Sequence, residues 1–111
     1  MAKLKNISFV MPVLNEEQYL ETAVTSVLSQ QTPGKKELVL ALGHSSDGTN
    51  KIAKDLATRF DSLVLIDNVS GQTATGLNLA IEASKYEVVI RVDAHSELSE
   101  NYAEMAVKTL N

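Results

Sequence analysis

The chain has 111 residues, 44% of them hydrophobic, which is enough for one modest core and predicts a single domain. Its formal net charge is −4 at pH 7 and its lysines are scattered, apart from the pair Lys35-Lys36, so no nucleic-acid-binding surface is expected. The sequence contains no cysteine, which excludes disulfides and thiolate metal sites.

The first apolar stretch, at residues 7–11, is too short for a signal peptide and meets Pro12 and then acids. No window of the sequence approaches the roughly 20 apolar residues that a membrane span requires. We therefore expect a cytoplasmic protein.

Short apolar runs alternate with amphipathic segments along the whole chain. The runs predict strands, and the segments with apolar residues at helical spacing predict helices. Pro12 closes the first strand, and Pro33-Gly34 stops the first helix. In chain order we expect a strand at 7–11, a helix at 16–31, a strand at 37–42, a helix at 50–59, a strand at 63–67, a helix at 73–84, a strand at 87–93 and a helix at 97–110.

This alternation predicts an α/β fold with a doubly wound, mostly parallel, Rossmann-like sheet and helices on both faces. Right-handed crossovers give the strand order 3-2-1-4. Such sheets bind ligands at the carboxyl ends of the strands where the winding reverses, here between strands 1 and 4. The segments PVLNE and VDAH follow these two strands, and we expect them to share a site.

Asp93 and His95 stand two positions apart at the end of the fourth strand. In extended backbone they project to the same side, so a carboxylate and an imidazole can converge on one divalent cation. This donor pair suits Mn²⁺ better than Mg²⁺ and would leave positions open for a diphosphate. The alternative is that Asp93 caps the following turn and His95 is a solvated loop residue.

The segment PVLNEE, residues 12–17, has two interpretations. Asn15 can be the N-cap of a helix whose dipole Glu16 and Glu17 complement. Alternatively, the turn from Pro12 to Asn15 offers backbone groups that can grip a planar base.

Two further loops contain candidate ligand contacts. SSDGT, residues 45–49, is a turn with Thr49 as a possible N-cap, and Asp47 is a weaker candidate for ligand contact. SGQTATGLN, residues 70–78, has the glycine spacing of a phosphate-binding loop, but Leu77 stands where that loop needs lysine, so the motif fails. Asn78 remains a candidate for ligand contact.

Taken together, FVMPVLNEEQYLETAVTSVLSQ, SSDGT, ATGLNLAIEAS and EVVIRVDAH resemble the N-terminal half of a family 2 glycosyltransferase of the GT-A fold, closest to bacterial enzymes of succinoglycan-type exopolysaccharide synthesis. The resemblance implies that Pro12, Val13, Asn15 and Glu16 cradle the base of a nucleotide-diphosphate sugar. It also implies that Asp93 and His95, as a variant D-x-D motif, hold Mn²⁺ or Mg²⁺ against the diphosphate.

The implied reaction transfers a sugar to a glycan or lipid-linked acceptor with inversion at the anomeric carbon. The expected donor is a UDP-sugar. The complete enzyme would lie in the cytoplasm or peripherally at the inner face of the membrane. Family members extend further, so residues 1–111 are expected to form the nucleotide-sugar-binding domain alone, cut before the acceptor-binding half and the catalytic base. Such a fragment would be inactive and could self-associate through the surface left uncovered.

The sequence departs from the family pattern at two places. Family members commonly carry an aspartate after strand 2 that reads the base, where this chain has Leu42-Gly43-His44. The usual A-R-N of the third helix reads GLN here, with Leu77 in the place of the basic residue.

Two other classes of function remain open. A phosphoacceptor signalling domain has similar length and would use Glu16-Glu17 and Asp67, but the sequence offers no fifth strand with a following lysine. A non-catalytic α/β interaction module would use an exposed sheet edge to bind a partner.

Overall fold

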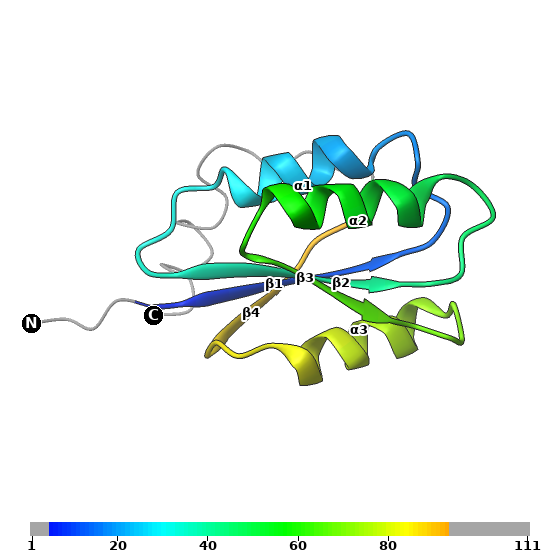
Figure 1. The fold of residues 1–111 in the computed structure, drawn as a ribbon. Coiled ribbons are helices and arrows are strands. Elements are labelled where there is room, and N and C mark those ends of the chain that lie inside the picture. The colour runs from blue at the N-terminus through cyan, green and yellow to red at the C-terminus, as the bar shows by residue number, and fades with distance from the viewer. Residues whose placement is uncertain (1–4, 94–111) are drawn as a thin grey trace, which may run out of the picture.

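The structure is a computed structural model, and it describes residues 5–93. Strands and helices alternate through this range as the sequence predicts, and the helix expected at 97–110 lies outside it (Figure 1). The elements are β1 (Ile7–Val13), α1 (Leu20–Leu28), β2 (Lys36–Leu42), α2 (Thr49–Arg59), β3 (Leu63–Asp67), α3 (Thr73–Ala83) and β4 (Val88–Arg91).

The four strands form one parallel sheet in the order β3-β2-β1-β4, which confirms the predicted order. β1 pairs with β2 along its whole length, whereas β4 pairs with β1 only as far as Arg91, opposite Val10. Pro12 lies beyond the last residue paired with β4. Its missing N–H therefore removes no bond from the β1–β4 ladder, and β1 continues through it, opposite Ala41 of β2, to Val13 instead of ending at residue 11.

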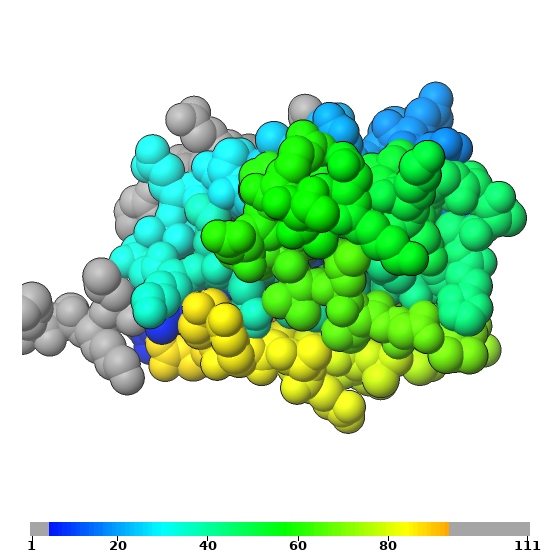
Figure 2. Space-filling model, in the orientation of Figure 1, coloured from blue at the N-terminus to red at the C-terminus, as the bar shows by residue number. Residues whose placement is uncertain are grey.

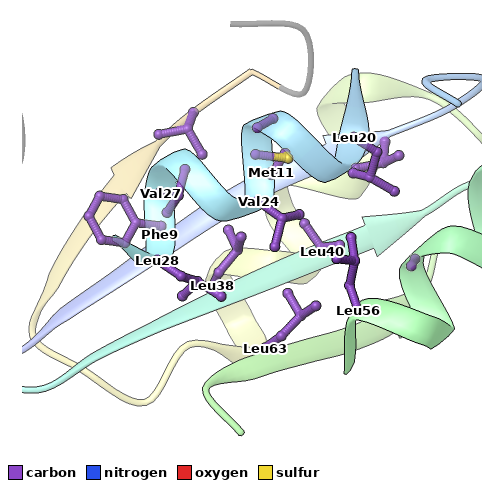
Figure 3. Packing of buried hydrophobic residues seen from close by; sticks show 14 of the residues in the cluster. Phe9, Met11, Leu20, Val24, Val27, Leu28, Leu38, Leu40, Leu56 and Leu63 are labelled. Carbon is purple, nitrogen blue, oxygen red and sulfur yellow. The ribbon is translucent and has the colours of Figure 1, made fainter. Parts of the chain in front are cut away.

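The sheet separates two apolar cores of unequal size. α1 and α2 cover one face and α3 covers the other (Figure 1). In Figure 2, the green atoms of α2 lie at the top of the view and the yellow-green atoms of α3 at the bottom. On the first face, Leu20 and Val24 of α1 pack over the buried strand residues, among them Phe9 and Leu40 (Figure 3). The core on the α3 face is smaller and comprises Val10, Val39, Ala41 and Ala80, with Val64, Ile66 and Leu77 packed against it.

The α3 face is less well covered at β4 than at the other strands. α3 packs on β1, β2 and β3. Val89 of β4 pairs with Ser8, which lies on the same side of β1 as Val10, and it remains 39% exposed. Within residues 5–93, this end of the face is therefore accessible.

Helix α1 begins four residues later than the expected start at Glu16. Asn15 adopts a positive φ of 53°, and a turn follows in which the N–H groups of Tyr19 and Leu20 donate to the carbonyl of Glu16. The N-cap is Tyr19, without a side-chain capping bond, so Asn15 does not cap the helix. The backbone N–H groups of Glu16 and Glu17 instead donate to the side chains of Thr49, the first residue of α2, and of Asp47 in the loop before it.

A buried polar network joins β1, β2 and the chain before β4 at the amino edge of the sheet. Glu37 is only 3% exposed, and its Oε2 accepts a hydrogen bond of 2.6 Å from Ser8 Oγ. The same Oε2 accepts from the backbone N–H of Lys85 at 2.9 Å, and Ser8 Oγ accepts from the N–H of Tyr86 at 3.2 Å. These bonds satisfy the buried groups and fix where β4 begins.

Candidate functional site

A cavity of about 320 Å³ opens at the carboxyl edge of the sheet beside β1 and β4. It brings together four of the residues that the sequence nominates for the site: Pro12, Val13, Glu16 and Asp93. The rest of its lining comprises Leu14, Asn68, Gly71, Thr73 and Arg91. The two strand ends singled out by the sequence thus face one hollow, in the place where this sheet architecture binds ligands.

Asp93 stands at the β4 side of this cavity with its side chain 55% exposed. Its Oδ1 lies 3.8 Å from Arg91 Nη2, which is long compared with the roughly 2.7–2.9 Å of a charge-assisted hydrogen bond. Among residues 5–93, the Asp93 carboxylate is therefore held only loosely.

Asn15 joins the loop after β1 to the loop after β2. Its side-chain Oδ1 accepts from the N–H of Ser46 at 2.8 Å, and its own N–H donates to Ser45 Oγ at 2.9 Å. The side chain that the sequence nominates for base binding thus has partners within the protein. The left-handed φ of Asn15 matches the tolerance of asparagine for this conformation.

Asp47 completes this connection, which we call the loop clamp (residues 15–17 with 45–49). Its Oδ1 accepts from both the N–H and the hydroxyl of Thr49, and its Oδ2 accepts from the N–H of Glu17 at 3.4 Å. Thr49 is fully buried and its Oγ1 accepts from the N–H of Glu16 at 2.8 Å. The hydrogen bonds from Thr49 lower the pKa of the Asp47 carboxyl below its ordinary value.

Of the remaining nominated residues, Asn15 and Asp47 line a second hollow of about 380 Å³, together with Glu17, Gln18 and Tyr19. Glu16 lines both hollows. Asn78 lies exposed on α3 and lines neither of these two cavities. His95 lies outside the described residues.

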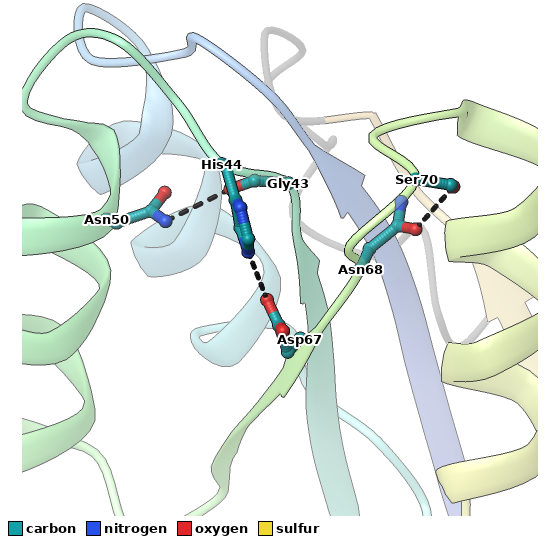
Figure 4. Close-up of polar contacts among 6 residues, drawn as sticks. All are labelled: Gly43, His44, Asn50, Asp67, Asn68 and Ser70. Atoms are coloured by element: carbon teal, nitrogen blue, oxygen red, sulfur yellow. Dashed lines mark hydrogen bonds and ion pairs between the residues drawn. The ribbon is translucent and has the colours of Figure 1, made fainter.

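The loop before α3 contributes lining residues that the sequence reasoning missed. Asn68 is 2% exposed, and its Nδ2 donates to the carbonyl of Gln72 at 3.1 Å, while its Oδ1 accepts from Ser70 Oγ at 2.8 Å (Figure 4). Gly71 has a φ of +69°, which glycine adopts without strain. At Gly76, a Cβ would come within 2.6 Å of Asn68 Nδ2. The sequence signal in this loop is its glycine spacing, which matches a phosphate-binding loop except for Leu77.

Two departures from the family pattern belong to the core rather than to the cavity. Leu42 is 7% exposed in the larger core, and Leu77 packs against the smaller one. Two residues after Leu42, His44 Nε2 lies 3.1 Å from Asp67 Oδ1, and both side chains are largely exposed (Figure 4). Asp67, the acceptor required by the signalling-domain alternative, is thus paired with an imidazole.

The described lining of the main cavity offers carboxylate oxygens for a divalent cation from two residues, Asp93 and Glu16. A carboxylate oxygen is the kind of ligand that Mn²⁺ and Mg²⁺ accept, so the cavity fits such an ion. Within residues 5–93, no three His, Cys, Asp or Glu side chains gather into a complete metal site. In the same range, no helix is long and apolar enough to cross a membrane.

Comparison with known proteins identifies the family. Residues 8–111 match the family model "Glycosyl transferase family 2". The chain is 32% identical over 101 residues to the succinoglycan biosynthesis protein ExoA of Rhizobium meliloti, covering 89% of this chain and 31% of that protein. It is 29% identical over 107 residues to the glycosyltransferase AglE of Haloferax volcanii, covering 95% of this chain and 35% of the relative.

Among solved structures, the chain resembles a mannosyltransferase from Pyrobaculum calidifontis in complex with GDP-Man and Mn²⁺, with a TM-score of 0.89 and 25% identity over 97% of this chain and 33% of that one. The chain spans about a third of the length of the curated relatives it matches. The fold and the resemblance expected from the sequence are confirmed, and the signalling-domain alternative is set aside. The chain belongs to glycosyltransferase family 2.

Proposed function

We propose that this chain is the donor-binding part of a glycosyltransferase, and that it binds a nucleotide-diphosphate sugar in the cavity between β1 and β4. The observation that carries the proposal is that Pro12, Val13 and Glu16 at one strand end and Asp93 at the neighbouring end line the same hollow. The Pyrobaculum relative, which shares this fold, was solved with a nucleotide sugar and a metal ion.

In this proposal, different residues of the chain bind different parts of the donor. The turn after β1 holds the base with backbone groups of Pro12 and Val13, and Leu14 supplies apolar surface at 42% exposure. The loop clamp keeps that turn in place. Asp93 faces the diphosphate and, together with His95, would hold Mn²⁺ or Mg²⁺. When bound, such an ion neutralises charge that develops on the departing diphosphate.

The substrates and the outcome of the transfer are also proposals. We propose an inverting transfer from a UDP-sugar to a glycan or lipid-linked acceptor in polysaccharide or cell-envelope glycan synthesis, in the cytoplasm or at the inner face of the membrane. The acceptor-binding residues and the catalytic base would lie outside these 111 residues, and the isolated chain would bind donor without transferring sugar.

Calorimetric titration tests donor binding. UDP and GDP are titrated into the chain with Mn²⁺ and with EDTA, using wild type and Asp93→Asn. We expect one of the two nucleotides to bind more tightly in Mn²⁺, and this gain to disappear in Asp93→Asn. Wild type that binds neither nucleotide, or a variant that keeps the full gain from Mn²⁺, would refute the proposal.

We also propose that the isolated chain self-associates. β3 and β4 are the edge strands of the described sheet, and the α3 face is open beside Val89. Sedimentation velocity over a wide concentration range would show a rising mass, whereas a constant monomer mass would contradict this proposal.

A further inference from the structure

We propose that Arg91 binds the diphosphate of the donor, and that it exchanges its contact with Asp93 for a contact with phosphate when the donor enters. This inference rests on the proposed donor site. It adds a residue that neither the D-x-D resemblance nor the base-binding turn includes.

The position of Arg91 follows from the register of β4. Arg91 is the last residue of this strand and pairs with Val10, which belongs to the core on the α3 face. Paired residues of parallel strands project to the same side, so the Arg91 side chain leaves the sheet on that face. The neighbouring Val89 on this side is exposed, which leaves room beside the guanidinium. Arg91 then lines the main cavity instead of packing under a helix.

The charges around the cavity explain why a cation is needed there. Its described lining contains two carboxylates, Glu16 and Asp93, and one cation, Arg91. The whole chain carries a net charge of −4. Without Arg91, the charged groups in the described lining would be carboxylates alone, and their repulsion would oppose the binding of a diphosphate.

The contact between Arg91 and Asp93 is weak enough to be exchanged. The two charged groups are 3.8 Å apart, and their side chains are 53% and 55% exposed. A phosphate can offer the planar guanidinium two oxygens at hydrogen-bonding distance, which the loose pair with Asp93 does not. Exchange would also free the Asp93 carboxylate for a cation. In the absence of donor, Arg91 and Asp93 thus compensate each other's charge. When the donor binds, phosphate replaces Asp93 beside Arg91, and a cation can replace Arg91 beside Asp93.

Phosphate-specific binding measurements test this role. Calorimetry in EDTA compares UDP and GDP with their neutral nucleosides, uridine and guanosine. We expect Arg91→Gln to weaken binding of the preferred nucleotide by about tenfold, as for loss of one charge-assisted contact, and to leave nucleoside affinity unchanged. Arg91→Lys should retain part of the affinity because it keeps the charge but loses the planar fork.

Two variants control for charge. Arg59→Gln removes the other arginine, which pairs with Glu21 and Asp55 on the opposite face and lines neither cavity, and it should leave nucleotide binding unchanged. Asp93→Asn in EDTA releases Arg91 and removes a negative charge, so nucleotide should bind roughly twofold to threefold more tightly. Urea unfolding of each variant verifies that it is folded.

The outcomes separate the two proposals. If wild type binds the nucleotide and Arg91→Gln binds it equally well, or if nucleoside affinity falls as much as nucleotide affinity, the role of Arg91 is refuted and the donor site stands. If wild type binds neither nucleotide nor nucleoside, the donor site itself fails and the role of Arg91 fails with it.

Discussion

The loop clamp and the main cavity both place carboxylates at the carboxyl edge of the sheet, yet they engage them in opposite ways. In the clamp, both oxygens of Asp47 accept hydrogen bonds from the protein, and its partner Thr49 is buried. In the cavity, the contact that Asp93 makes within residues 5–93 is a long one with Arg91, and its side chain is half exposed. A saturated carboxylate holds loops together, whereas a loosely paired one retains its capacity for a ligand.

The largest expected effect comes from breaking the clamp at Thr49. Thr49→Val keeps the shape of the side chain but leaves the N–H of Glu16 without its hydroxyl acceptor, in a partly buried position. We expect a loss of about 2 kcal/mol in the free energy of unfolding, measured by urea denaturation. Thr58→Val on α2, where the exposed hydroxyl donates to the carbonyl of Asp55, is the matched control and should change stability little. Equal effects of the two variants would contradict the structural role of the clamp.

The corresponding change in the cavity should affect binding and not stability. Asp93→Asn removes a carboxylate from an exposed pair, which contributes at most about 1 kcal/mol and typically less. We expect its urea midpoint to match wild type, while the affinity for the preferred nucleotide in Mn²⁺ falls about tenfold. A large loss of stability would place Asp93 with the clamp residues and remove the contrast.

Gly71 tests the contribution of the cavity's backbone to stability, for comparison with that of the loop clamp. Gly71→Ala forces a side chain onto a φ of +69°, although its Cβ meets nothing closer than a Leu14 methyl at 4.0 Å. The expected cost is about 1 kcal/mol of unfolding free energy, from conformational strain alone. Gly76→Ala is the comparison variant for steric overlap without backbone strain, because its φ is not left-handed but its Cβ would overlap Asn68 Nδ2. If Gly71→Ala costs nothing, the left-handed turn at the cavity is not maintained in solution.

The smallest effect is the pH dependence of the clamp. Hydrogen bonds from Thr49 lower the pKa of Asp47 in the folded protein, so the folded state binds its proton less readily than the unfolded state. The stabilisation is present above the ordinary aspartate pKa and is lost as the pH falls through the lower, folded value. The difference in urea midpoint between wild type and Asp47→Asn should therefore be greatest near neutral pH and shrink in acid. A constant difference would show that the carboxylate charge does not matter.

The fold could be predicted because its signals are local. Each apolar run and each helical pattern is contained in a few residues, and the crossover rule then fixes the order of the strands. The boundaries were less accurate where distant partners intervene. The start of α1 moved because the N–H groups of Glu16 and Glu17 bond to residues about 30 positions later.

The site could be predicted only in part, for the same reason. Sequence pattern brought Pro12, Val13, Glu16 and Asp93 to one edge, and the structure places them around one cavity. It could not show that the side chain of Asn15 bonds to Ser46, since the two are 31 residues apart. Arg91 was overlooked although it stands two positions before Asp93, the same spacing that had suggested pairing Asp93 with His95.

The buried Glu37 at the amino edge has a consequence for the chemistry at the opposite edge. A slip of β4 by one residue would move the N–H groups of Lys85 and Tyr86 away from their acceptors and leave a desolvated carboxylate short of donors. The same slip would turn Arg91 towards the α1 and α2 core and bury its charge. The hydrogen bonds at the start of β4 therefore fix the strand register that places the Arg91 guanidinium in the cavity. Substitutions at Ser8 or Glu37 should disturb ligand binding although neither residue contacts a ligand.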